Sequence, residues 1–255
     1  MRSLLTETEG WTVGTLERDP HLPTFHLSID PVGRSGAENM AVDAELLDRA
    51  DGTGEGFLRL YRFDPPCLSL GRNEPAARYD HTEIARRGLD VVRRPTGGRA
   101  VWHEHEVTYA VAAPLAAFGS LRNAYYTVHE RIAAALRSLG AGATLAPYQP
   151  PPSGRVDQPA SCFATPVGGE VLVAGRKLVG SAQVRKRSAF LQHGSILLDG
   201  SQEIVAAVSR TPQVASAATT LSAELGRRVT WDEVVEAVVQ AWRDEGTSLA
   251  PLDVA

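Results

Sequence analysis

A cysteine and a lysine, fifteen residues apart, are the side chains of this sequence best suited to covalent chemistry. Cys162 lies in a Ser-Cys-Phe segment after a proline-rich stretch, and Lys177 lies in the glycine-rich segment GRKLVGSAQ at 175–183. A thiolate is a strong nucleophile, and nearby positive charge favours its formation. The pair therefore predicts a cysteine nucleophile assisted by a lysine. For Cys162, a small buried hydrophobe remains the alternative interpretation.

Lysine is rare in this chain, with two lysines against 24 arginines. Arginine is planar and always protonated, whereas lysine is a compact point charge whose proton affinity changes with its surroundings. Retention of an ammonium at Lys177 suggests a task that arginine cannot perform, although chance placement is the alternative. Lys186 lies in an Arg-Lys-Arg run and is interpreted as solvated charge. Cys67, in an apolar strand-like segment, is interpreted as a buried thiol.

A Gly-Gly pair between arginines, in RRPTGGRAVWH at 93–103, is a third candidate for chemistry. Such a pair lets backbone N–H groups approach an anionic or carbonyl-bearing ligand. It is neither a P-loop nor a dinucleotide fingerprint, because both need other glycine spacings and a following helix. A strand is expected to follow here. A hairpin turn with surface arginines is the alternative.

Two histidines alternate with glutamates directly after this loop, in HEHE at 103–106. On a strand, His103 and His105 would share one face and could bind a metal. A third ligand is not evident nearby, so no metal site is predicted. His103 is interpreted instead as a hydrogen-bonding group that lines a pocket.

The composition is that of an ordinary globular chain of 255 residues, with 43% hydrophobic and 22% charged residues. A net charge of −4 gives no reason to expect nucleic acid as a partner. No apolar run approaches the roughly 18 residues needed to cross a bilayer, and residues 1–7 lack the apolar core of a signal peptide. Two cysteines form neither a disulfide framework nor a zinc pattern. We therefore expect a cytoplasmic protein without a membrane partner.

Three helices are predicted from capping signals and apolar periodicity. They cover residues 35–51, with Ser35 and Glu38 as a capping box, residues 122–139, and a segment that starts at Thr230 with Glu233 as its capping partner. The predicted apolar face of the first consists of Ala37, Met40, Ala41, Ala44 and Leu47. That of the second consists of Tyr125, Val128, Ile132, Leu136 and Leu139, and that of the third of Trp231, Val234, Val235, Val238 and Trp242.

Strands are predicted between these helices, at 57–62, 67–70, 107–113, 170–174, 177–183 and 188–198. A tight turn at Gly175-Arg176 would join two of them into a hairpin. The proline-rich stretch 147–161 is predicted to be a loop, and long loops in compact domains are often functional. Hairpins together with segregated helices favour an α+β fold with mixed, largely antiparallel sheets.

Five segments resemble, in order, conserved blocks of the lipoate–protein ligase/octanoyltransferase family. They are ENMAVD at 38–43, SLGRN at 69–73, the glycine loop at 93–103, GRKLVGSAQ at 175–183 and LQHGSIL at 191–197. The resemblance covers about residues 25–245 and implies the catalytic-domain fold shared by biotin and lipoate protein ligases. It predicts an N-terminal extension at 1–24, one acyltransferase or ligase catalytic domain at 25–245, and a C-terminal tail at 246–255.

The resemblance also implies residue roles. In that family the glycine loop and the Gly-Ser-Ala-Gln strand line a tunnel for an eight-carbon acyl chain, and the motif lysine binds the acyl carbonyl. Carried over, Lys177 and Cys162 become the predicted catalytic residues. The predicted substrate-binding residues are Asn73, Arg94, Thr96, Gly97, Gly98, Arg99, Ala100, His103, Gly180, Ser181, Ala182, Gln183, His193 and Gly194.

Two chemistries share this scaffold. Cysteine-dependent octanoyltransferases take octanoate from octanoyl-acyl carrier protein through an enzyme thioester and need no cofactor, whereas lipoate ligases use ATP and Mg to form an acyl-adenylate. Both deliver an octanoyl or lipoyl group to a lysine of a lipoyl domain in a 2-oxo acid dehydrogenase complex, or of the glycine cleavage H protein. Cys162 and the Gly97-Gly98-Arg99 loop, where many ligases have a third glycine, favour the transferase. The ligase is the alternative, and a non-catalytic acyl- or lipoyl-domain-binding protein is the second.

Overall fold

A six-stranded mixed sheet forms the centre of the computed structural model, which describes residues 24–147, 163, 168–211 and 218–252. Its strand order is β10-β11-β6-β2-β1-β12. The strands are β1 (Phe25–Ile29), β2 (Gly56–Tyr61), β6 (Glu106–Pro114), β10 (Val179–Lys186), β11 (Ala189–Leu197) and β12 (Leu249–Pro251). The pairs β10-β11, β11-β6 and β6-β2 are antiparallel, and β1 pairs in parallel with β2 and β12. β12 thus adds part of the expected C-terminal tail to the main sheet.

Two three-stranded sheets flank the main sheet. The first contains β4 (Asp90–Arg93), β3 (Cys67–Leu70) and β5 (Val101–His103), so a strand does follow the glycine loop. The second contains β7 (Ala143–Leu145), β8 (Val171–Val173) and β9 (Arg176–Lys177). The hairpin turn between β8 and β9 is Ala174-Gly175, one residue earlier than predicted, since Val173 pairs with Arg176.

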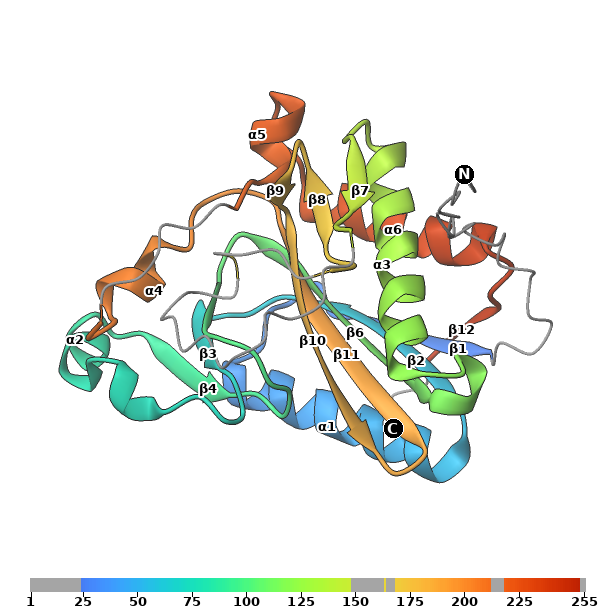
Figure 1. Ribbon diagram of the computed structural model, residues 1–255, viewed down its shortest axis with the longest axis horizontal. Coiled ribbons are helices and arrows are strands. Elements are labelled where there is room, and N and C mark those ends of the chain that lie inside the picture. Colours follow the sequence, from blue (N-terminus) through green and yellow to red (C-terminus); the bar gives the residue numbers. More distant parts are fainter. Residues whose placement is uncertain (1–23, 148–162, 164–167, 212–217, 253–255) are drawn as a thin grey trace, which may run out of the picture.

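Three long helices cover the two faces of the main sheet (Figure 1). They are α1 (Gly36–Thr53), α3 (Leu121–Ser138) and α6 (Trp231–Asp244). The short helices are η1 (Ala76–Arg78), α2 (His81–Arg86), η2 (Leu115–Ala117), α4 (Glu203–Ala207) and α5 (Leu221–Leu225). Among the described residues, no helix combines the length and apolarity needed to cross a membrane.

Alternation along the strands divides the core between these helices. Tyr109 and Val111 of β6 belong to the core that packs on α3 and α6, whereas Ala110 and Ala112 belong to the core that packs on α1. Successive side chains of a strand point to opposite faces of the sheet, so one strand supplies both cores. The predicted α+β architecture is confirmed.

The predicted face of α1 is only partly right. Its capping box is present, and Met40 and Leu47 are buried, but the alanines at 37, 41 and 44 are exposed. Asn39 and Asp43 are fully buried instead. Both are hydrogen-bonded by the buried guanidinium of Arg59 on β2, which removes most of the cost of burying polar groups. Apolar periodicity does not detect such a face.

Candidate active site

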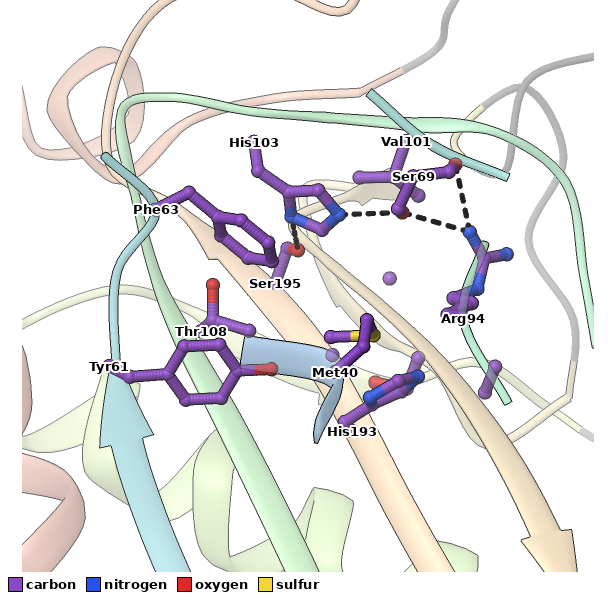
Figure 2. A pocket seen from close by; sticks show the side chains of 14 residues that line it. Met40, Tyr61, Phe63, Ser69, Arg94, Val101, His103, Thr108, His193 and Ser195 are labelled. Carbon is purple, nitrogen blue, oxygen red and sulfur yellow. Dashed lines mark hydrogen bonds between the residues drawn. The ribbon is translucent and has the colours of Figure 1, made fainter. Parts of the chain in front are cut away.

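A pocket enclosing about 350 Å³ of space, part of it open to solvent, lies where the main sheet faces β3 and β5. Strands β6, β10 and β11 contribute one wall, and α1 contributes Met40 (Figure 2). Its lining combines apolar surface with several hydroxyl and imidazole groups. The lining residues are Met40, Tyr61, Phe63, Ser69, Arg94, Val101, His103, Thr108, Gly180, Ser181, Ala182, His193, Gly194 and Ser195.

Arg94 fixes the glycine loop beside this pocket. Its guanidinium donates hydrogen bonds to the carbonyl oxygens of Gly97 and Arg99, and to both the carbonyl and the hydroxyl of Ser69. Gly71 brings a second turn against the loop, because a Cβ at this position would lie 2.0 Å from the carbonyl oxygen of Gly98. The buried guanidinium therefore holds the backbone of the glycine loop in place. The neighbouring turn also needs a glycine, at position 71, because a side chain there would collide with the loop.

His193 on β11 is held at both ring nitrogens. Its Nδ1 lies 2.8 Å from Oδ2 of Asp43, and its Nε2 lies 2.7 Å from the hydroxyl of Thr96. Asp43 also accepts hydrogen bonds from Arg59 and Tyr61. Because a carboxylate oxygen can only accept, Nδ1 of His193 donates to Asp43.

His103 repeats this arrangement on β5. Its Nδ1 lies 2.6 Å from Oε1 of Glu106, and its Nε2 lies 2.7 Å from the hydroxyl of Ser69, which stands between His103 and Arg94 in Figure 2. The hydroxyls of Thr108 and Ser195 donate to the same carboxylate oxygen. Since His103 is buried and the His105 side chain is 58% exposed, the two histidines do not face one site.

Ser181 belongs to a third buried chain of hydrogen bonds. Its hydroxyl lies 2.8 Å from Nε2 of His129 and 2.6 Å from the hydroxyl of Tyr109. Nδ1 of His129 lies 2.7 Å from the carbonyl oxygen of Gly169, which can only accept, so Nδ1 carries the proton. Burial lowers the pKa of His129 to about 3, and the nearby charge of Lys177 adds to that shift. His129 is therefore a neutral acceptor at pH 7.

Lys177 lies beside the pocket and not in its lining. Its Nζ is 2.5 Å from Oε1 of Glu170, and both side chains are almost fully buried. The ammonium also lies 5.3 Å from the centre of the Phe163 ring. That ring packs against Gly180 in the pocket wall, where a Cβ would lie 2.7 Å from it. Cys162, the predicted nucleophile, lies outside the described residues.

Comparison with known proteins now identifies the family. Residues 35–243 match the model of the lipoyl protein ligase A/B catalytic domain. The chain belongs to this family. An octanoyltransferase LipM of Kyrpidia tusciae is 44% identical over 187 residues, which is 70% of this chain and 68% of that protein. Another, of Moorella thermoacetica, is 40% identical over 221 residues, which is 80% of each chain.

Solved structures of the lipoyl protein ligase family share the fold. A lipoate–protein ligase A bound with ATP superposes with a TM-score of 0.72 at 18% identity, covering 90% of both chains. The bipartite lipoate protein ligase of Thermoplasma acidophilum superposes with a TM-score of 0.62 at 19% identity, covering 92% of this chain and 87% of that one. At such identities the likeness establishes the fold alone.

Half of the substrate-binding residues predicted from the family resemblance line the pocket. These are Arg94, His103, Gly180, Ser181, Ala182, His193 and Gly194. Thr96 lies behind His193, and the side chain of Gln183 donates to that of Gln192. The pocket lining does not include Asn73, Gly97, Gly98, Arg99 or Ala100, which belong to the glycine loop and its neighbouring turn.

Sequence reasoning missed the groups that hold this family's pocket residues in place. Asp43 and Glu106 each position a pocket histidine, His129 positions Ser181, and Glu170 pairs with Lys177. Asp43 is the last residue of the ENMAVD segment, and Glu106 is the last residue of the HEHE run, so both belong to motifs already recognised in the sequence. The predicted hairpin already placed Glu170 and Lys177 on adjacent strands, but the contact between their side chains depends on a strand register that differs from the predicted one.

Proposed function

We propose that this chain is an octanoyltransferase that moves an octanoyl group from a thioester donor to a lysine of a lipoyl domain. The observation that carries the proposal is its similarity to octanoyltransferases LipM, at 44% identity over 187 residues and 40% over 221. Structural likeness to lipoate ligases does not favour adenylate chemistry, because it extends to the fold alone.

The pocket suits an acyl chain, which offers hydrophobic surface and no hydrogen bonds beyond its carbonyl. Met40, Tyr61, Phe63 and Val101 contribute apolar surface. The imidazoles of the lining already have partners at both nitrogens, so an aliphatic chain beside them leaves no imidazole nitrogen without a partner. Burial of each methylene contributes about 0.8 kcal/mol to binding.

Cys162 and Lys177 are the catalytic residues in this proposal. The Cys162 thiolate attacks the thioester carbonyl, a C–S bond to the enzyme forms, and the donor thiolate leaves and takes a proton. The amine of the acceptor lysine then attacks the acyl-cysteine, its N–C bond forms, and its proton passes to the departing Cys162 sulfur. Lys177 and N–H groups of the glycine loop stabilise the oxyanion in both steps.

Octanoyl-acyl carrier protein is the donor that we propose. The acceptors are lipoyl domains of 2-oxo acid dehydrogenase complexes or the glycine cleavage H protein. Conversion of a thioester to an amide is downhill, so the reaction requires neither ATP nor Mg. The acyl donor and the acceptor domain are each expected to dock outside the pocket, with only the acyl group entering it.

Intact mass after incubation with octanoyl-acyl carrier protein tests this proposal. We expect an octanoyl adduct on the protein and on the Cys67→Ser variant, the matched control for loss of a thiol. The Cys162→Ser variant should form none. An adduct that persists in Cys162→Ser would refute the assignment of the nucleophile.

A second assay separates the alternatives. A lipoyl domain is incubated with the protein and either octanoyl-acyl carrier protein, or free octanoate with ATP and Mg. Modification from the carrier without ATP supports the transferase. Modification only from free acid with ATP would establish the ligase instead, and tight octanoate binding without turnover would indicate a binding protein.

A further inference from the structure

Lys177 forms a buried ion pair with Glu170, a residue that has no role in the proposed reaction. Glu170 is 2% exposed and Lys177 is 1% exposed, with 2.5 Å between Oε1 and Nζ. Removing two charges from water is costly, and two well-packed apolar residues would often stabilise a fold equally well. Stability alone therefore does not explain why this pair is present.

Rigid backbone holds both members of the pair. Glu170 follows Gly169, a glycine with a left-handed backbone conformation. The carbonyl oxygen of Gly169 accepts a hydrogen bond from His129, and its N–H donates to the carbonyl oxygen of Ala146. The carbonyl of Glu170 accepts in turn from the N–H of Ala146. Hydrogen bonds therefore hold the backbone on both sides of the Glu170 Cα, and this fixes the direction of the Glu170 carboxylate.

The lysine is anchored from the other side. Lys177 pairs with Leu172 across the β8-β9 hairpin, and its carbonyl accepts from the N–H of Thr219. Its ammonium then extends toward Glu170 and the Phe163 ring. The Phe163 ring also contacts Gly180 of the pocket wall, so the ion pair lies directly behind the acyl pocket.

We propose that Glu170 is a positioning residue for acyl transfer, which holds the Lys177 side chain in place directly behind the acyl pocket. This rests on the proposed octanoyl transfer. The Glu170 carboxylate lies 2.5 Å from Nζ and so determines where the lysine nitrogen lies. Lys177 then acts as a charged hydrogen-bond donor to the oxyanion and not as the base, so the proton of the acceptor amine passes to the departing thiolate.

Three variants test the role of Glu170. Glu170→Gln keeps the shape and removes the charge, and Glu170→Asp keeps the charge but shortens the reach. The matched control is Glu130→Gln, which removes a carboxylate that is 52% exposed and pairs with Arg137 at 2.6 Å on the surface of α3. Single-turnover assays measure acylation by octanoyl-acyl carrier protein and transfer to a lipoyl domain, each as a rate constant and an amplitude.

We expect Glu170→Gln to lower both rate constants by about 10- to 100-fold, somewhat less than loss of an oxyanion-hole donor itself. KM should stay within about twofold, because the interaction matters in the transition state. Glu170→Asp should recover part of the rate, and Glu130→Gln should match the unmodified protein. Rate constants are independent of the folded fraction, whereas a purely structural role would lower the amplitude alone.

The outcomes are distinguishable. Unchanged rate constants in Glu170→Gln, with a normal adduct in the unmodified protein, would overturn the positioning role and leave the octanoyltransferase intact. Lack of an adduct in the unmodified protein would overturn both. Should Glu170→Gln fail to fold, Glu170→Asp decides: a lower rate constant at unchanged KM supports the proposal, and a rate equal to the unmodified protein refutes it.

Discussion

Asp43 is the residue whose replacement should reveal most about the architecture of the pocket. Its carboxylate is fully buried and accepts hydrogen bonds from Arg59 at 3.0 Å, from the Tyr61 hydroxyl at 2.8 Å and from Nδ1 of His193 at 2.8 Å. It therefore ties α1 and β2 to the histidine in the pocket wall. Asp43→Asn keeps the volume but removes the charge and one acceptor oxygen.

The expected loss of stability follows from counting donors. Tyr61 and His193 share Oδ2, and Arg59 uses Oδ1, so the amide nitrogen of asparagine must face at least one of these donors. Each buried donor without an acceptor costs about 1–3 kcal/mol. Breaking a buried ion pair costs about 3–5 kcal/mol, but Arg59 retains Asp30 and Asn39 as partners. We expect the free energy of unfolding to fall by about 2–4 kcal/mol.

This loss of stability is measured by urea unfolding of two variants, each with one aspartate of helix α1 replaced. Asp48→Asn is the matched control, because the Asp48 side chain is 61% exposed and pairs with Lys186 at the surface. Loss of such a pair costs at most about 1 kcal/mol. If Asp43→Asn and Asp48→Asn destabilise the protein equally, the buried network contributes no net stability and the reasoning is wrong.

Three further predictions concern other buried groups. The pKa of His129 falls from 6.5 to about 3 on folding, so on acidification the unfolded chain takes up this proton first. The free energy of unfolding, measured with urea, should therefore fall by about 1.4 kcal/mol from this group between about pH 7.5 and about pH 5.5. This fall should disappear in His129→Gln but persist in His105→Gln. Gly71→Ala should displace the glycine loop and slow octanoyl transfer by at least about 10-fold, whereas Gly52→Ala, with open space around it, should leave transfer rates unchanged. Burial raises the pKa of Cys67, so in Cys162→Ser this thiol should resist iodoacetamide at about pH 8 until urea is added; rapid labelling of the folded protein would contradict its burial.

Helices and strands could be predicted from the sequence, but the buried polar groups could not. Capping boxes at Ser35 and Thr230 placed two helix starts correctly, because those signals are local. The apolar stripe of α6 was also predicted correctly, since all five of its predicted residues belong to one hydrophobic core, namely Trp231, Val234, Val235, Val238 and Trp242. The face of α1 was mispredicted because its buried positions include Asn39 and Asp43, whose burial depends on Arg59 of a distant strand.

Tertiary contacts likewise explain which site residues were missed. The family resemblance pointed to His103 and His193 but not to Glu106 and Asp43, the carboxylates that orient them. A histidine in a motif indicates a site, whereas its partner is recognised only when strand pairing brings the two together. Glu170 illustrates this most clearly, because it lies seven residues before Lys177 and reaches it across a hairpin.

Among the residues that the structure describes, His103, His129 and His193 are the buried histidines, and their hydrogen bonds have a common consequence for catalysis. Each has one nitrogen bonded to a carboxylate or carbonyl and the other to a hydroxyl, at Glu106 and Ser69, Asp43 and Thr96, and Gly169 and Ser181. A ring whose acceptor nitrogen already receives a hydroxyl proton must break that bond before it can accept another, and breaking a buried hydrogen bond costs about 1–3 kcal/mol. His103 and His193 therefore shape the wall of the pocket, and His129 holds Ser181 in that wall. Stabilisation of charge in the proposed reaction falls instead to the ion pair behind Phe163, where Lys177 and Glu170 are held together.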